Sequence, residues 1–352
     1  MSNKHLPHDL KQMQSLPLEA KIIMTQQRIR QWYEYWDGMV YVSFSGGKDS
    51  TVLKHIVDGM YDDVPSLFVN TGLEYPEIQK FAMSQKNVIT VRPEMRFDEV
   101  IKKYGYPAIS KEVSQQLYEV RKSAELHSIP PRDTAPYNRK FNPDSDYCKK
   151  HPSYCLKKWD FLIDADFNLS HMCCAVTKKK PAKQYEKETG RKPFIGTLAE
   201  ESRLRKTQWM IKGCNAFDGE RPRSVPMSFW TEQDILHYIK KYNIPYCSVY
   251  GDIQVKRPVD ADSDQMNIID MLECYEPEDT LETTGCDRTG CIFCMFGCHN
   301  EGSPNKFQRL KETHPRQYEY CIGGGEMVDG KWQPNKAGLG LGKVLDYIGV
   351  KY

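Results

Sequence analysis

The sequence has no long hydrophobic run, little net charge and no segment typical of a secretory leader. None of its apolar runs approaches the ~20 residues that a membrane-spanning helix needs, so we expect no membrane span. Residues 1–5 are polar and lack the apolar core of a signal peptide. The formal net charge is only +2 over 352 residues, so bulk charge does not require an anionic partner. These absences predict a cytoplasmic protein without a membrane partner.

The 12 cysteines are therefore not expected to form a disulfide framework, because the cytosol keeps thiols reduced. Six of them are scattered and are expected to be plain thiols: Cys148, Cys155, Cys214, Cys247, Cys274 and Cys321. The other six are grouped along the chain: Cys173, Cys174, Cys286, Cys291, Cys294 and Cys298. Grouped soft thiolates in a reducing compartment favour a metal ion or an iron–sulfur cluster.

The Walker A spacing is absent, yet residues 41–51 (YVSFSGGKDST) predict a phosphate site of another kind. A β-rich run breaks at two glycines and continues as a helix start. Such glycines let the backbone approach an anion, and the first N–H groups of the helix point at it. The alternative is that these residues form an ordinary strand-to-helix turn that binds no ligand. The residues expected to bind the anion are Ser45, Gly46, Gly47, Lys48, Asp49, Ser50 and Thr51.

Strands and helices alternate along the chain. After a helical lead-in that stops at Asp37 and Gly38, strands are expected at residues 39–44, 65–70 and 87–91. This alternation predicts a three-layer, doubly wound, mostly parallel α/β sheet, in which ligands bind at the carboxyl ends of strands. The expected domains are a lead-in (1–37), a Rossmann-like nucleotide-binding domain (38–250) and a small cysteine-rich C-terminal region with a glycine-rich tail (251–352).

Two further strand-to-helix turns are candidates for the same pocket. Polar residues follow the second strand at 70–74, although a turn after a strand is often polar. A second turn, at 196–205, carries acids and arginines, and planar guanidinium groups suit phosphate or sulfate oxygens. The arginines could instead be exposed helix residues. The candidates are Thr71, Gly72, Glu74, Glu201, Ser202, Arg203 and Arg205.

Three later segments are harder to assign. Residues 127–154 are rich in Pro, Asp and basic residues, and we expect a long loop or insertion. Residues 258–284 are acidic and irregular, which is typical of a connection. Residues 307–318 are expected to be helical, and the glycine-spaced tail after them either folds over the active site or is loosely ordered.

The grouped cysteines form two local patterns. Cys173 and Cys174 are adjacent and cannot easily bond each other, but both can bind one multinuclear cluster. Cys291 and Cys294 form a Cys-x-x-Cys knuckle whose thiolates converge on one centre. Four local cysteines also suit a tetrahedral zinc site, so the metal stays open at this point. Two buried thiols beside a basic helix start are the plain alternative for the adjacent pair.

Residues 43–50 (SFSGGKDS) resemble the PP-loop of the adenine-nucleotide α-hydrolase superfamily, and more narrowly of the phosphoadenosine phosphosulfate (PAPS) reductase family. The segments at 70–76, 173–181, 196–203 and 226–246 resemble further motifs of this family, in family order. Many relatives carry arginine where this chain has Leu198. The resemblance covers roughly residues 25–300. It implies the family fold and an adenine nucleotide, whether ATP, adenylylsulfate or PAPS.

The cysteine pattern is similar to that of iron–sulfur adenylylsulfate reductases. That resemblance implies a [4Fe-4S] cluster, with zinc as the alternative, and a lysine, Lys178, near it. The pattern is also similar to that of DNA-phosphorothioation relatives, in which all four ligands lie in one stretch of the chain. In that arrangement Cys286 or Cys298 would replace Cys173 or Cys174 as a ligand. The ligands that this resemblance favours are Cys173, Cys174, Cys291 and Cys294.

Three functions follow from the resemblance. The first is a thiol-dependent reductase of adenylylsulfate or PAPS, with Lys48, Lys178, Arg203 and Cys321 in catalysis and a thiol reductant as partner. The family's reductases attack with a cysteine in the C-terminal tail, whereas residues 322–352 here contain none. The second is an ATP pyrophosphatase that adenylates a nucleic acid or small molecule for thiolation, with Mg²⁺ and a sulfur-donor protein. The third is a non-enzymatic nucleotide-sensing cluster protein.

Overall fold

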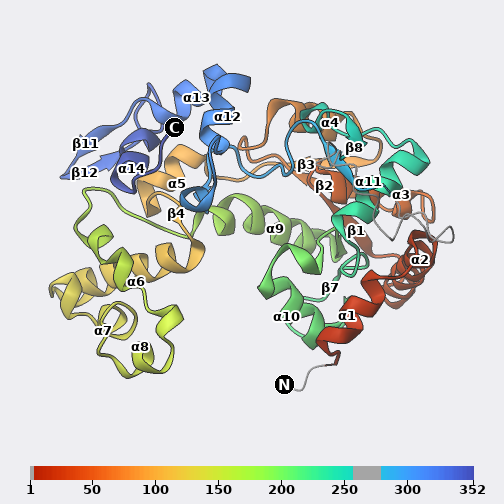
Figure 1. The fold of residues 1–352 in the computed structure, drawn as a ribbon, viewed down its shortest axis with the longest axis horizontal. Coiled ribbons are helices and arrows are strands. Elements are labelled where there is room, and N and C mark those ends of the chain that lie inside the picture. The colour runs from red at the N-terminus through yellow and green to blue at the C-terminus, as the bar shows by residue number, and fades with distance from the viewer. Residues whose placement is uncertain (1–3, 257–278) are drawn as a thin grey trace, which may run out of the picture. The chain divides into compact units, whose positions relative to one another are not determined.

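The computed structural model describes residues 4–256 and 279–352, and its chain forms two compact units that are interleaved in sequence (Figure 1). The first unit comprises Met1–Asn70, Tyr75–Val91 and Gln184–Thr289. The second comprises Thr71–Glu74, Arg92–Lys183 and Gly290–Tyr352. The contiguous division expected from the sequence, at residues 37 and 250, stays a prediction about domains.

A six-stranded sheet forms the centre of the first unit. Its strands lie in the order β3 (Val88–Val91), β2 (Ser66–Val69), β1 (Val40–Phe44), β5 (Lys192–Ile195), β7 (Arg223–Ser224) and β6 (Asn215–Ala216). All neighbouring strands are parallel except β6 and β7. In the register of the central pairs, Val42 lies opposite Ser66 on β2 and Phe194 on β5. The predicted doubly wound, mostly parallel α/β fold is confirmed.

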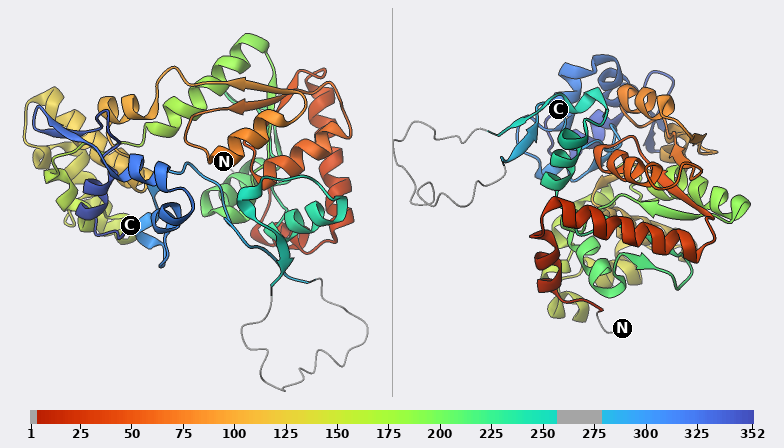
Figure 2. Two further views of the ribbon diagram at one scale, coloured as in Figure 1. Left: turned by 90° about the horizontal axis from the view of Figure 1, so that it is seen from above. Right: turned by 90° about the vertical axis from the view of Figure 1, so that its right-hand side faces the viewer.

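Helices cover both faces of this sheet. They are α1 (Pro7–Gln14), α2 (Leu18–Tyr35), α3 (Lys48–Asp58), α4 (Pro76–Ser84), α9 (Lys180–Thr189, which begins in the second unit), α10 (Arg203–Lys212) and α11 (Glu232–Tyr242). Two short turns and a two-stranded ribbon complete the unit: η5 (Ala199–Glu201), η6 (Ser248–Tyr250), β8 (Ile253–Val255) and β9 (Leu281–Thr283). Figure 2 shows α1 and α2, in red, along one side of the sheet.

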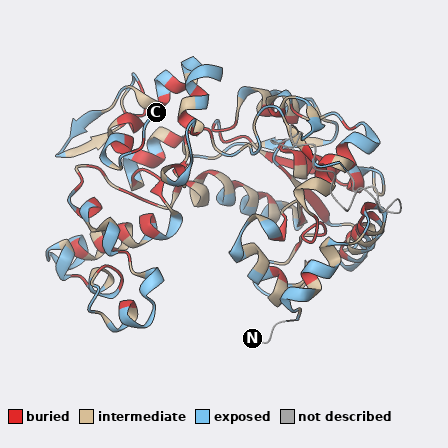
Figure 3. Ribbon diagram, in the orientation of Figure 1, coloured by how far each residue is buried: buried red, intermediate tan, exposed pale blue. Residues whose placement is uncertain are grey.

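The core of the first unit lies between the sheet and these helices. Ile29 and Trp32 of α2 and Val40 and Val42 of β1 have no exposed surface, which is the burial expected of apolar side chains between layers. The Trp230 indole N–H donates to the Thr25 hydroxyl at 2.9 Å, so this buried polar pair is satisfied. Figure 3 shows the strands mostly buried and the outer helix surfaces exposed.

Local sequence signals fix where two of these helices begin and end. α2 stops just before Gly38, whose φ is 72°. The Thr231 hydroxyl accepts from the Asp234 N–H and caps α11, as the sequence predicted, and Asn243 ends that helix in the left-handed region with φ 47°. These signals are local in the chain, which is why the sequence alone located the helices.

The second unit is mostly helical. Its elements are α5 (Phe97–Tyr104), β4 (Ala108–Ile109), α6 (Lys111–His127), η1 (Pro131–Asp133), α7 (Ala135–Lys140), α8 (Asp146–Lys150), η2 (Pro152–Tyr154), η3 (Lys157–Asp164), the π-helix η4 (Ala175–Lys179), β10 (Met295–Phe296), η8 (Cys298–Asn300), α12 (Lys306–Thr313), α13 (Pro315–Ile322), β11 (Glu326–Val328), β12 (Lys331–Gln333) and α14 (Leu341–Tyr347). Strands β4 and β10 pair in parallel and join the cysteine-rich region to the rest of the unit.

Residues 127–154, predicted as a long loop or insertion, form four short helices, so the prediction of a loop was wrong and that of an insertion stays a prediction. The hydroxyls of Thr134 and Ser145 accept from backbone N–H groups and cap α7 and α8. The rings of Tyr137 and Phe141 stack with centroids 5.7 Å apart, and Phe141 is fully buried. Caps and a buried aromatic ring order a segment whose composition suggested a loop.

The C-terminal segments also depart from expectation. The helix predicted over 307–318 is divided at His314, where Pro315 begins α13. The glycine-spaced tail is ordered rather than loose: β11 and β12 pair, and Val344 and Leu345 of α14 are fully buried. The predicted connection over 258–284 lies mostly outside the described residues. No helix in the described part of the chain is both long and apolar enough to span a membrane.

Candidate functional site

The glycine loop joins β1 to α3 through backbone geometry that glycine allows. Gly46 has φ 73°, in the left-handed region where a side chain is strained. A Cβ atom on Gly46 would lie 3.1 Å from Ile78 Cγ2, and one on Gly47 would lie 3.2 Å from the Tyr250 hydroxyl oxygen. Both positions therefore favour glycine, and the chain passes directly from strand into helix.

β1 is also the strand at which the sheet changes its direction of winding. Its neighbours are β2 on one side and β5 on the other, although β2 follows it in the chain and β5 comes much later. Doubly wound proteins bind ligands at such a switch point, at the carboxyl ends of the strands. The glycine loop follows the carboxyl end of β1, so the structure puts it at the expected binding edge.

Three hydroxyl groups hold the loop in shape. The Ser50 and Thr51 hydroxyls each donate to the Gly47 carbonyl oxygen at 2.9 Å. The Ser45 N–H donates to Ser50 Oγ at 3.2 Å, and the Gly47 N–H donates to Ser45 Oγ at 3.3 Å. These hydroxyls stabilise the turn itself. Their role as donors to a ligand stays a prediction.

Lys48, the cation predicted for the loop, is buried and already has partners. Its ammonium forms an ion pair with Glu232 and donates to the Asp287 carbonyl oxygen at 2.8 Å. Its backbone N–H donates to the Tyr250 hydroxyl at 3.2 Å, and that hydroxyl lies 2.6 Å from Thr289 Oγ1. The sequence reading missed these partners, because they lie about 180 to 240 residues further along the chain.

Asp49 lies among charges of both signs. Burial raises its pKa to about 6, the Lys48, Arg288 and Arg205 cations oppose this, and Glu232 adds to it. The same interactions show that Arg205 and Arg288 lie within electrostatic reach of the loop. Arg205 was predicted as an oxyanion ligand. Arg288 was missed, because it lies among the grouped cysteines, whose pattern predicted a metal site instead.

The turn at residues 196–205, which follows β5, packs against the glycine loop. A Cβ atom on Gly196 would lie 3.1 Å from the Asp49 carbonyl oxygen, so the two turns pack closely. Glu201 forms an ion pair with Arg205 and lies 3.9 Å from Arg288. Ser202 caps α10 by accepting from the Arg205 N–H at 3.2 Å, and Arg203 is exposed. Of the four predicted residues, Arg205 therefore has the best-supported position for an anion contact.

The turn at residues 70–74 is divided between the units. Asn70 belongs to the first unit, whereas Thr71, Gly72 and Glu74 belong to the second. The Thr71 hydroxyl donates to the Glu74 carboxylate at 2.7 Å, and the Thr71 N–H donates to it at 3.1 Å. The Glu74 side chain is thus held by its own turn, and Lys178 lies 4.0 Å from it.

Four of the grouped cysteines come together in the second unit. Burial raises the pKa of the Cys173 thiol, and nearby Cys291, Cys174 and Cys294 raise it further. Burial likewise raises the pKa of Cys291, which also interacts with Cys294 and Cys174. These mutual effects place the thiols of two segments more than 100 residues apart within electrostatic reach of one another.

The adjacent pair begins an irregular helix that also carries Lys178. Residues 175–179 form a π-helix, a rare element that often marks a functional site. Burial disfavours the Lys178 cation, but Cys291 and Glu74 outweigh this and raise its pKa above the usual range. Lys178 is therefore a positive charge beside the gathered thiols, and its position near a cluster stays a prediction.

The Cys-x-x-Cys knuckle is a tight turn that is fixed by a lysine. The Cys294 N–H donates to the Cys291 carbonyl oxygen at 3.1 Å, and the Ile292 N–H donates to the Leu73 carbonyl oxygen at 2.8 Å. The Lys306 ammonium donates to the carbonyl oxygens of both Cys291 and Cys294. Lys306 was missed by the sequence reading, because nothing in its local sequence distinguishes it.

The remaining cysteine candidates have other hydrogen-bond partners, although Cys298 also interacts with Cys294. Cys286 belongs to the first unit, where its thiol donates to the Tyr75 hydroxyl at 3.7 Å. The Cys298 thiol donates to the Met295 carbonyl oxygen at 3.0 Å, and burial raises its pKa to about 11. Cys321 is fully buried in α13, and burial raises the pKa of its thiol far above the usual range.

The gathered thiols are not arranged as a closed site for one ion. Within residues 4–256 and 279–352, no three or more His, Cys, Asp or Glu side chains are already placed to hold a metal ion. The donor set itself is four thiols with a lysine beside them, which suits a multinuclear sulfur-bridged cluster.

Fold and glycine loop together define an α/β protein of the PP-loop class. Residues 39–131 and 144–296 match the family model of the phosphoadenosine phosphosulfate reductase domain, and they make up more than half of the chain. The chain therefore belongs to the PAPS reductase family, and the resemblance drawn from the motifs is confirmed.

Two further similarities are weaker. An uncharacterized protein of Methanocaldococcus jannaschii is 34% identical over 86 residues, which is 22% of this chain and 21% of that protein. The chain thus matches only about a fifth of that relative's length. The crystal structure of PAPS reductase from Candida auris, in a phosphate complex, aligns with 70% of this chain and 90% of its own at 14% identity and a TM-score of 0.36. The family assignment rests on the family model alone.

Proposed function

We propose that the protein is an adenine-nucleotide-dependent iron–sulfur enzyme of sulfur metabolism that acts in the cytoplasm. The first unit would bind the charged tail of the nucleotide at the glycine loop. The second would hold a [4Fe-4S] cluster through Cys173, Cys174, Cys291 and Cys294. The observation that carries the proposal is the convergence of these four thiols beside Lys178, in a chain of the PAPS reductase family.

The nucleotide site rests on the loop and on the cations near it. The backbone N–H groups at the start of α3 and the helix dipole favour an anion at the switch point of the sheet. Lys48 and Arg205, with Arg288, supply positive charge near Asp49. Glu232 and Asp49 are carboxylates in the same place, so Mg²⁺ would offset their charge when a polyphosphate binds. ATP, adenylylsulfate and PAPS all present the required anionic tail.

The cluster site rests on the chemistry of its donors. Four thiols from two segments match the number of ligands that a [4Fe-4S] cluster takes, and Lys178 and Lys306 supply positive charge around them. A cluster bound there would supply a redox-active, electron-rich group. Lys178 would supply positive charge beside the cluster, while Lys306 would keep the knuckle in its turn.

The structure of α13 bears on which reaction the enzyme performs. A thiol-dependent reductase needs an accessible thiolate, but Cys321 has no exposed surface and a strongly raised pKa. An ATP pyrophosphatase that adenylates an acceptor for thiolation needs no cysteine in the tail. The burial of Cys321 therefore favours the adenylating sulfurtransferase over the adenylylsulfate or PAPS reductase. A sulfur-donor protein and a small-molecule or nucleic-acid acceptor would be its partners.

Anaerobic purification with iron, sulfide and zinc analysis tests the cluster. We expect about four irons and four sulfides per chain, an absorption band near 400 nm, and loss of both in Cys173→Ala and Cys291→Ala. Cys155→Ala is the matched control, because Cys155 is a half-buried thiol outside this group. A colourless protein with one zinc per chain would contradict the iron–sulfur proposal.

Product analysis separates the two reactions. With ATP, a sulfur donor and an acceptor, we expect AMP and pyrophosphate, and we expect Lys48→Ala to abolish them while leaving the iron content unchanged. Cys321→Ser should retain the activity if the protein still folds. Sulfite release from adenylylsulfate or PAPS with a thiol reductant, lost in Cys321→Ser, would instead establish the reductase. Nucleotide binding without turnover of any of the three substrates would favour a sensing role.

A further inference from the structure

Residues 285–289, here called the strap, lie against the glycine loop within the first unit. A Cβ atom on Gly47 would lie 3.4 Å from Thr289 Oγ1 in the strap and 3.2 Å from the hydroxyl oxygen of Tyr250, which contacts the strap. Glycine loops leave their backbone open so that an anion can approach it. Here two hydroxyl oxygens of the chain itself make that approach.

Lys48 is the loop residue whose donors these groups engage. Its backbone N–H, at the start of α3, donates to the Tyr250 hydroxyl at 3.2 Å. Its ammonium donates to the carbonyl oxygen of Asp287, in the strap, at 2.8 Å and forms an ion pair with Glu232. A backbone N–H has a single hydrogen to donate, so a ligand oxygen and the Tyr250 hydroxyl compete for it.

The Tyr250 hydroxyl is held from two sides. It accepts from the Lys48 N–H, so its own proton can be donated to Thr289 Oγ1, which lies 2.6 Å away. The ring is 2% exposed and belongs to an apolar cluster with Ile78 and Cys247. Packing thus holds the ring, whereas only the hydroxyl bonds to the loop. Removing the hydroxyl alone leaves this packing in place.

The strap is anchored at its start and exposed at its tip. Its first two N–H groups donate to the carbonyl oxygens of Tyr250 and Val249, at 2.9 and 3.0 Å, and tie it to η6. Asp287 and Arg288 are exposed, and within the described part of the chain the last three N–H groups of the strap make no backbone hydrogen bond. A segment with few backbone hydrogen bonds and an exposed surface moves at low cost.

We propose that the strap and Tyr250 form an autoinhibitory contact, which occupies the donors of Lys48 and is displaced when an anion binds at the glycine loop. A ligand oxygen would replace the Tyr250 hydroxyl on the Lys48 N–H, and another would replace the Asp287 carbonyl oxygen on the ammonium. Charged oxygens bind such donors more strongly than neutral ones do, so the contact favours a polyphosphate over an uncharged nucleoside. This inference rests on the proposed nucleotide site and names the groups that its ligand must displace.

Calorimetry with inorganic pyrophosphate on the full-length protein tests the contact. Tyr250→Phe keeps the ring and removes the competing hydroxyl, so we expect about fivefold tighter binding. Thr289→Val leaves the Tyr250 hydroxyl without its acceptor, and we expect about threefold tighter binding. Because both substitutions act through the same hydroxyl, the double variant should bind no more tightly than Tyr250→Phe alone.

Tyr246→Phe is the matched control. The Tyr246 hydroxyl donates to the Gly251 carbonyl oxygen at 2.9 Å, and its ring packs against the same apolar cluster, so the affinity should change less than about 1.5-fold. Unchanged or weaker binding in Tyr250→Phe, or in Thr289→Val if the first variant does not fold, would overturn the inference while leaving the nucleotide site in place. If none of these proteins bound pyrophosphate or ATP, the nucleotide site itself would be wrong, and the autoinhibitory contact with it.

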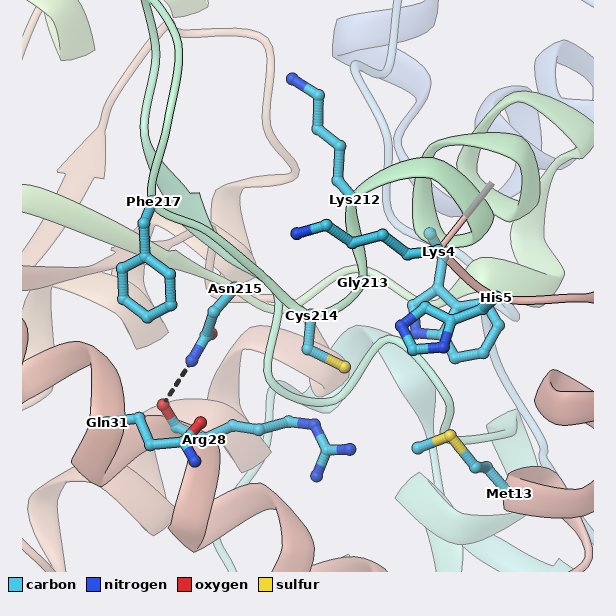
Figure 4. A pocket seen from close by; sticks show the side chains of 11 residues that line it. Lys4, His5, Met13, Arg28, Gln31, Lys212, Gly213, Cys214, Asn215 and Phe217 are labelled. Atoms are coloured by element: carbon cyan, nitrogen blue, oxygen red, sulfur yellow. Dashed lines mark hydrogen bonds between the residues drawn. The ribbon is translucent and has the colours of Figure 1, made fainter. Parts of the chain in front are cut away.

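A basic cavity elsewhere in the first unit provides the control for where pyrophosphate binds. It has a volume of about 260 Å³, and Figure 4 shows its basic side chains pointing in different directions. Lys212→Gln, at this cavity, should leave the affinity unchanged, whereas Lys48→Ala should weaken it at least about tenfold. Equal losses in the two variants would mean that pyrophosphate is not bound by the loop, and would overturn the inference. The basic residues of the cavity are Lys4, His5, Arg28 and Lys212.

A tyrosine signal reports the displacement directly. In spectra of protein labelled with ¹³C in its tyrosine rings, the peak that is missing from Tyr250→Phe should shift when pyrophosphate is added. The peak that is missing from Tyr246→Phe should stay in place. A Tyr250 peak that does not move at saturating pyrophosphate would overturn the proposed displacement.

Discussion

The Lys48 ammonium and the Glu232 carboxylate form an ion pair within the first unit, between the first residues of two helices. The Lys48 side chain is 6% exposed and that of Glu232 is 42% exposed, so the lysine is the buried partner. An anionic ligand at the glycine loop has to compete with Glu232 for this cation. The pair should therefore lower the affinity of the loop for an anionic ligand, and this effect can be measured.

Glu232→Gln should tighten binding of ATP in the absence of Mg²⁺ about fivefold, because it removes a competing charge worth ~1 kcal/mol. Lys48→Ala should weaken the same binding at least tenfold. Both affinities can be measured by calorimetry at 0.15 M salt. Glu34→Gln, which removes an exposed carboxylate on α2, is the charge-matched control and should leave the affinity unchanged. Weaker binding by Glu232→Gln would mean that Glu232 serves the ligand rather than opposing it.

Asp49 predicts a pH-dependent stability. Its pKa is raised to about 6 from 3.8, chiefly by burial, so ionisation costs more in the folded than in the unfolded protein. The cost is absent below pH 3.8, grows between pH 3.8 and 6, and is complete above pH 6. Asp49→Asn should therefore raise the free energy of unfolding at pH 7.5, by up to ~3 kcal/mol, and change it little at pH 4.

Urea unfolding at the two pH values measures this difference. Asp62→Asn is the control, because Asp62 is exposed near the same sheet and should give the same small effect at both pH values. If Asp49→Asn proved equally neutral at pH 4 and pH 7.5, Asp49 would not carry the buried charge that its position implies.

The loop and the cysteine patterns could be predicted from the sequence because each is local. A strand, two glycines and a helix start occupy adjacent positions, and so do Cys291 and Cys294. The partners that complete each site could not be predicted, since Glu232 and Tyr250 reach the loop only through the packing of α11 and η6. The ordered helices at 127–154 were missed for a related reason: Phe141 is buried by tertiary contacts that composition does not reveal.

Lys306 should control how well the knuckle holds the proposed cluster. Its ammonium donates to the carbonyl oxygens of Cys291 and Cys294, so Lys306→Gln removes the positive charge and weakens both hydrogen bonds. We expect at least a threefold drop in iron per chain after dialysis against a chelator. Lys311→Gln on the same helix is the control, because that lysine lies over the Tyr318 ring instead. Equal iron retention in both variants would show that Lys306 does not support the site.

Gly46→Ala tests whether the glycine loop needs a residue without a side chain. Alanine at φ 73° costs roughly 1–2 kcal/mol, and its Cβ atom would lie 3.1 Å from Ile78, so the loop must shift. We expect lower stability in urea and at least tenfold weaker ATP binding by calorimetry. Gly59→Ala at the other end of α3 is the matched control: its φ is −71° and its nearest contact would be 3.4 Å, so it should be neutral or slightly stabilising. Full ATP affinity in Gly46→Ala would show that the nucleotide tail binds elsewhere, because the turn cannot keep its shape with a side chain at that position.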